Sequence, residues 1–90
     1  MEILFAQSGQ DCGSSAVSLY CGKRKLAEVG IGSSEKVELE EGGCQLAVVC
    51  GTYRIDVNVD GPCTLEVSWS TARGSMIVSI NNRVVGERTI

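Results

Sequence analysis

The residues that could do chemistry are five cysteines and scattered carboxylates, because the chain contains no histidine. General acid–base catalysis near neutral pH usually recruits histidine, and a cysteine nucleophile needs an activating base or a local positive field. Only Cys21 has basic neighbours in sequence, the run from Lys23 to Lys25. Asp56 and Glu66 are a carboxylate pair of the kind that glycosidases use, but we expect them on a flat sheet face. The residue types therefore argue against an enzyme, and we expect no catalytic residue and no cofactor.

The spacing of the cysteines matches no metal-binding rule. They include no C-x-x-C pair, whereas structural zinc sites usually present close Cys or Cys/His pairs. We therefore expect no metal and interpret them as small apolar core residues, with disulfides as the alternative if the protein acts outside the cell. If the segment from Cys44 to Cys50 is extended, its ends lie about 20 Å apart, at ~3.3 Å per residue, and cannot form a disulfide. The five are Cys12, Cys21, Cys44, Cys50 and Cys63.

Charge and composition argue against several binding classes. The 90 residues carry eleven acidic and eight basic side chains, a net charge of −3, whereas proteins that bind the phosphate backbone need a basic surface. One Trp, two Tyr and one Phe are few for stacking on bases. After Met1 there is neither a basic leader nor an apolar run long enough for a transmembrane helix. We therefore expect no direct contact with nucleic acid, no membrane association and a cytoplasmic location.

Alternation of apolar and polar residues is the strongest structural signal, and it is clearest from Tyr53 to Trp69. Odd positions are apolar from Tyr53 to Val59, and the pattern resumes at Cys63 after residues 60–62. A period of two is typical of strands with one buried face. Matching apolar residues across strands predicts a hairpin in which Tyr53 pairs with Trp69 and Val59 with Cys63. This hairpin would place Trp69 in the core.

The other apolar runs are short and separated by turn residues every ten residues or so (about 8–12), which is typical of a sandwich or barrel. The run Leu46 to Val49 is apolar on both faces and predicts a central strand or a strand covered on both sides. A helix over Lys23 to Val29 is the competing interpretation, but seven residues are few for a stable helix. The last two strands are expected to join near residues 81–83. We predict a single all-β domain over 1–90, a small antiparallel, jelly-roll-like β-sandwich of about seven or eight strands.

Two charged runs are the candidate partner-binding residues. A basic tip is followed by an acidic stretch. Such charged residues commonly keep a sheet face in contact with water or protect an edge strand from pairing with another chain. The functional interpretation is that these patches meet between neighbouring copies or bind a partner. Apolar residues that break the alternation could add to an interface. We predict a non-catalytic protein-binding or assembly module, expected to be a homo-oligomer. The residues are Lys23, Arg24 and Lys25; Glu35, Glu38, Glu40 and Glu41; and, as apolar candidates, Leu4, Val48, Val85 and Ile90.

Two other functions stay open on the sequence. An acidic sheet edge could occupy the basic nucleic-acid channel of a host complex, as small phage-encoded inhibitors do. Alternatively, Trp69 at a strand end, or a loop pocket, could bind a sugar as in a lectin.

Overall fold

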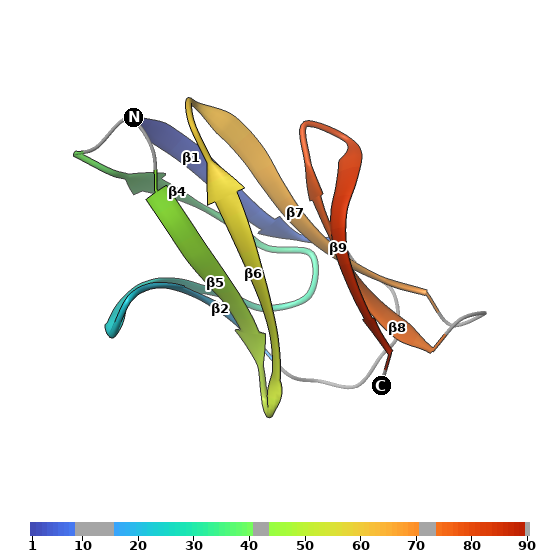
Figure 1. The fold of residues 1–90 in the computed structure, drawn as a ribbon. Helices are drawn as coiled ribbons and strands as arrows, with labels where there is room; N and C mark the ends of the chain where they lie inside the picture. The colour runs from blue at the N-terminus through green and yellow to red at the C-terminus, as the bar shows by residue number, and fades with distance from the viewer. Residues whose placement is uncertain (9–15, 41–43, 71–73, 90) are drawn as a thin grey trace.

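The computed structural model describes residues 1–8, 16–40, 44–70 and 74–89, which form nine strands and no helix. No helix that could cross a membrane is found among these residues. Two sheets pack face to face (Figure 1), which confirms the predicted all-β sandwich, with nine strands in place of seven or eight. The strands are β1 (Glu2–Gln7), β2 (Val17–Cys21), β3 (Arg24–Val29), β4 (Ser34–Glu38), β5 (Cys44–Cys50), β6 (Tyr53–Val59), β7 (Cys63–Ser70), β8 (Ser75–Ile80) and β9 (Arg83–Thr89).

The sheets differ in size and in strand direction. The five-stranded sheet has the order β4-β1-β7-β8-β9, and the four-stranded sheet has the order β3-β2-β5-β6. Neighbouring strands are antiparallel except β1 and β7, which run parallel. Strand β1 therefore lies between two strands that come later in the chain, and it is not paired with β2.

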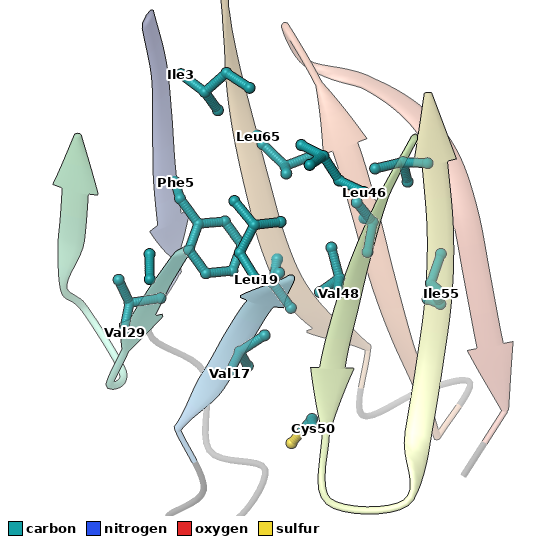
Figure 2. Packing of buried hydrophobic residues seen from close by; sticks show 14 of the residues in the cluster. Ile3, Phe5, Val17, Leu19, Val29, Leu46, Val48, Cys50, Ile55 and Leu65 are labelled. Atoms are coloured by element: carbon teal, nitrogen blue, oxygen red, sulfur yellow. The ribbon is translucent and has the colours of Figure 1, made fainter. Parts of the chain in front are cut away.

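The core lies between the two sheets and is built from alternate residues of strands β1 to β8. Phe5 and Ile3 of β1 point toward Leu19 of β2 and Leu46 of β5, with Leu65 of β7 beside them (Figure 2), and all five are fully buried. Because side chains alternate along a strand, the residues between these lie on the outer faces. Strand β9 is the exception, because none of its residues belongs to the core.

The predicted hairpin between β6 and β7 is wrong. Strand β6 pairs with β5, where Tyr53 lies opposite Cys50, whereas β7 pairs with β1 and β8, where Trp69 lies opposite Met76. Residues 60–62 carry the chain from one sheet to the other. The predicted hairpin and the observed crossing between sheets bury the same apolar residues. In the hairpin these residues would lie side by side in one sheet, whereas in the structure they face each other across the core. Alternation alone cannot distinguish between the two arrangements.

One buried polar side chain connects the two sheets. Gln7, at the end of β1, donates a hydrogen bond from Nε2 to the carbonyl oxygen of Val29 in β3, at 2.9 Å. Its Oε1 accepts a hydrogen bond from Nε1 of Trp69 in β7, also at 2.9 Å. Trp69 is 9% exposed, which confirms its predicted place in the core. Each polar group in this chain of hydrogen bonds has a partner, as burial requires.

Strands β8 and β9 join where the sequence predicts. Asn81 and Asn82 have φ values of 51° and 69°, the left-handed conformation that a two-residue type I′ hairpin needs at both central positions. Asparagine tolerates this conformation better than other residues with a side chain. The short polar segment therefore makes a tight turn.

Strand β9 curls toward β6 and closes one side of the sandwich (Figure 1). The ladder between β8 and β9 skips Val85, which forms a bulge, and bulges bend a strand. Beyond the bulge, a Cβ placed on Gly86 would lie 2.5 Å from Cγ2 of Ile55 in β6. The Arg88 guanidinium lies 5.9 Å from the centre of the Tyr53 ring, within cation–π range. A glycine is thus placed where the two edge strands come closest.

Candidate binding surface

The outer face of the four-stranded sheet carries a shallow depression with a volume of about 380 Å³. It lies over β5, between β2 and β6. The ladders place Tyr20 opposite Ala47 on one side and Arg54 opposite Val49 on the other. The lining residues are Tyr20, Gly22, Lys23, Ala47, Val49 and Arg54.

The floor of the depression is apolar because β5 is apolar on both faces. Leu46 and Val48 point into the core, so Ala47 and Val49 point outward. Ala47 is only 4% exposed, although it faces away from the core. Strand β5 is central in its sheet, as the run of apolar residues predicts. The outward half of this run forms the floor of a surface hollow.

Two cations and an aromatic ring surround this floor. Tyr20 is half-buried, and Lys23 is exposed in the turn between β2 and β3. Arg54 forms an ion pair with Asp56 on its own strand, through a hydrogen bond from Nε to Oδ1 at 2.9 Å, which uses one of the five N–H donors of a guanidinium. Lys23 forms no ion pair within the described part of the chain. The depression therefore suits an anionic group that carries an apolar body.

The three residues of the predicted basic tip do not lie together on one surface. Lys23 lines the depression, whereas Arg24 and Lys25 begin β3, the edge strand. Nζ of Lys25 lies 2.9 Å from Oε1 of Glu28, and this hydrogen bond raises the pKa of Lys25 above its ordinary value. Lys25 therefore has a partner within its own strand. Tyr20 and Arg54, which sequence reasoning missed, complete the surface around Lys23.

The predicted acidic stretch does not form one patch. Glu35 and Glu38 are exposed in the edge strand β4, but Glu35 pairs with Phe5 and Glu38 with Glu2, so they lie on opposite faces. Glu40 is exposed just after β4. The other predicted member, Glu41, lies outside the described residues. Glu2 lies opposite Glu38 in the ladder between β1 and β4, and we call Glu2, Glu38 and Glu40 the acidic corner.

The other sequence candidates for chemistry lie apart. Asp56 is on the outer face of the four-stranded sheet, whereas Glu66 pairs with Ala6 on the outer face of the five-stranded sheet. The expected carboxylate pair is therefore wrong, because β6 and β7 belong to different sheets. Trp69 is buried and hydrogen-bonded to Gln7, so its ring offers no exposed face to a sugar.

The apolar candidates for an interface have different positions. Val48 is fully buried, so its placement on an interface is wrong. Leu4 is half-buried on the outer face of the five-stranded sheet, and Val85 is 45% exposed at the bulge. Ile90 lies outside the described residues. Val84, 60% exposed beside the bulge, was not expected from the sequence.

The cysteines whose side chains are described pack against the core. Cys50 is a buried free thiol, Cys63 is a half-buried one, and Cys21 is half-buried. Burial raises the pKa of Cys50 and, together with the nearby Asp60 charge, that of Cys63. Strand β5 is extended, so Cys44 and Cys50 stand at its opposite ends. Cys12 and the side chain of Cys44 lie outside the description. Among the described residues no group of metal-binding side chains is found.

The raised pKa of Cys50 predicts a loss of stability in alkali. A thiol that holds its proton more tightly when folded stabilises the native state below its unfolded pKa, ordinarily 9.0, and this contribution disappears as the pH rises through the folded pKa. We expect the free energy of unfolding to fall as the pH rises from about 8 through the raised pKa of the folded state, and to fall less in Cys50→Ala. Urea unfolding of both proteins across this range measures the difference. Equal slopes would contradict the expectation.

No protein-family model matches the chain, and no curated protein or solved structure is similar to it.

Proposed function

We propose that the protein is a non-catalytic binding module that docks an acidic protein segment in the depression on its four-stranded sheet. The observation that carries this proposal is the apolar floor of Ala47 and Val49, bordered by Tyr20, Lys23 and Arg54. The floor and Arg54 belong to paired strands, which hold the site in shape before a partner arrives.

The chemistry of the lining defines the partner. A carboxylate can lie between Lys23 and the guanidinium of Arg54, which matches carboxylate geometry. The methylene groups of an acidic side chain, or a neighbouring apolar residue, can cover Val49 and pack against Tyr20. A volume of about 380 Å³ is at the small end of ligand sites. The depression therefore accommodates one or two side chains of a larger partner.

The affinity of this site for a short peptide should be modest. Ion pairs with exposed cations contribute ~0.2–1 kcal/mol each and weaken with salt. A partner protein would need to add contact area around the depression to form a stable complex.

The non-catalytic part of the proposal is supported by the residue chemistry. The sequence has no histidine, and the thiols of Cys50 and Cys63 have raised pKa values, which lowers the fraction of nucleophilic thiolate.

Neutralising the two cations is expected to weaken binding of an acidic peptide. The probe is a dye-labelled acetyl-Glu-Leu-Glu-Glu-amide, followed by fluorescence anisotropy in low salt. Loss of two ion pairs of ~0.2–1 kcal/mol each corresponds to about a two- to thirtyfold rise in Kd for Lys23→Gln/Arg54→Gln. The matched control is Lys36→Gln/Arg83→Gln, which removes the same charge from exposed positions outside the depression.

The control separates a site from general electrostatic attraction. We expect its Kd to stay close to that of the unmodified protein. An equal loss in both double variants, or no binding of the acidic peptide at all, would contradict the proposed site.

A further inference from the structure

One surface of this same chain is a candidate for the acidic segment that the depression accepts. Resting on the proposed function, we propose that the depression of one copy binds the acidic corner of a second copy, so that the copies associate head to tail. The observation behind this proposal is that two surfaces of complementary charge lie on opposite outer faces of one sandwich.

The acidic corner has the composition that the depression requires. Ile3 and Val37 pair with their side chains in the core, so the next pair in the ladder, Glu2 and Glu38, points outward. Both carboxylates are exposed, as is that of Glu40. Leu4, half-buried two residues along on the same face, supplies an apolar neighbour. An anionic group beside an aliphatic one matches two cations beside an apolar floor.

The like charges in the corner favour a cationic partner. Glu2 and Glu38 lie directly opposite each other, an arrangement that destabilises a sheet. Two positive groups already lie near these carboxylates: the N-terminal ammonium of Met1 is 4.0 Å from Oε2 of Glu38, and Lys36 lies two residues along β4 on the same face, opposite Leu4. Lys23 and Arg54 of a second copy would bring two positive charges to the corner and offset the repulsion. With three carboxylates against the Met1 ammonium and Lys36, the corner keeps an excess of negative charge, and this excess favours association at low ionic strength.

The position of the surfaces determines the type of assembly. The depression is on the outer face of the four-stranded sheet, whereas Glu2 and Glu38 of the acidic corner point outward from the five-stranded sheet. The two sheets are the layers in Figure 1. One chain cannot bring its own two surfaces together. A two-fold dimer cannot form both contacts either, because each copy would have to present both outer faces to the same partner. The contact is heterologous, and such contacts generate rings or open chains.

Mixing two neutralised variants tests this arrangement. Lys23→Gln/Arg54→Gln removes the basic surface, and Glu38→Gln/Glu40→Gln removes most of the acidic one. Glutamine removes the charge without a large change in the size of the side chain. Circular dichroism checks that each variant is folded. Sedimentation velocity over a concentration series, at low salt and in 1 M NaCl, gives the size distribution of each protein and of the equimolar mixture.

We expect the unmodified protein to form concentration-dependent species larger than a dimer, which dissociate in 1 M NaCl as screening increases. Each double variant alone should be monomeric. The mixture should stop at a heterodimer, because only one productive contact remains between the two variants.

The results that would overturn this inference differ from those that would overturn the proposed function. If the acidic-corner variant assembles as the unmodified protein does, or if the unmodified protein is monomeric while the acidic peptide still binds, the partner is not this corner. A basic partner protein, as expected for an inhibitor, would then be the better candidate for Glu38 and Glu40. If the basic variant still assembles and still binds the peptide, the depression itself is not the site.

Discussion

Replacing Gln7 with leucine is expected to lower the free energy of unfolding by about 2–6 kcal/mol, since two buried polar groups lose their partner at about 1–3 kcal/mol each. These groups are the indole N–H of Trp69 and the carbonyl oxygen of Val29, both bonded to Gln7 at 2.9 Å. Leucine fills a similar volume, so the change removes hydrogen bonding more than packing. For a domain of this size the loss is a large part of the total stability, which is typically about 5–15 kcal/mol. Urea unfolding followed by tryptophan fluorescence measures it.

The matched control for this prediction is Trp69→Phe, alone and combined with Gln7→Leu. Phenylalanine has no N–H group, so in its presence Gln7→Leu leaves one orphaned group in place of two. The double variant should therefore be more stable than the sum of the single changes implies, with a coupling energy of about 1–3 kcal/mol. Circular dichroism can follow the variants that lack the indole. Strict additivity would show that the bond between Trp69 and Gln7 is not formed in solution.

Replacing Gly86 with alanine is expected to destabilise the fold by about 1–3 kcal/mol through overpacking. The new methyl group would lie 2.5 Å from Cγ2 of Ile55, an atom fixed by branching at Cβ, so either β9 or β6 must move. Gly30→Ala is the control, since Gly30 is exposed and a Cβ there meets nothing within 4 Å. Thermal unfolding compares the two variants.

A second substitution tests whether the contact between β9 and β6 causes this loss of stability. In an Ile55→Ala background the clashing atom is gone, so Gly86→Ala should cost much less than it does with isoleucine present. If Gly86→Ala and Gly30→Ala have the same small effect, β9 does not lie against β6 as described.

The sequence predicted the strands well because alternation depends only on which face is buried. The pattern from Tyr53 to Val59 and again from Cys63 to Trp69 identified two strands with a core face each. It could not identify their partners, since apolar residues can meet across the core as well as side by side. The parallel pairing of β1 with β7 joins segments about sixty residues apart, and no local pattern carries that information.

The candidate surface was only partly accessible to sequence reasoning. Lys23 was identified from its basic neighbours, and the apolar run at Leu46 to Val49 was identified as a central strand. Tyr20 and Arg54 were missed because they meet only through the order β2-β5-β6, which places both beside β5. The outward residues of a strand that is apolar on both faces must be covered by side chains of its neighbouring strands. This requirement is the signal that could have identified Tyr20 and Arg54.

The most direct test of the binding surface is the residue-by-residue response of the ¹⁵N-labelled protein to the acetyl-Glu-Leu-Glu-Glu-amide peptide. Chemical-shift changes should concentrate on the backbone amides of Tyr20, Lys23, Ala47, Val49 and Arg54, and should disappear in Lys23→Gln/Arg54→Gln. Changes centred on another face of the sandwich, or a uniform absence of changes at millimolar peptide, would contradict the assignment of this surface as the binding site.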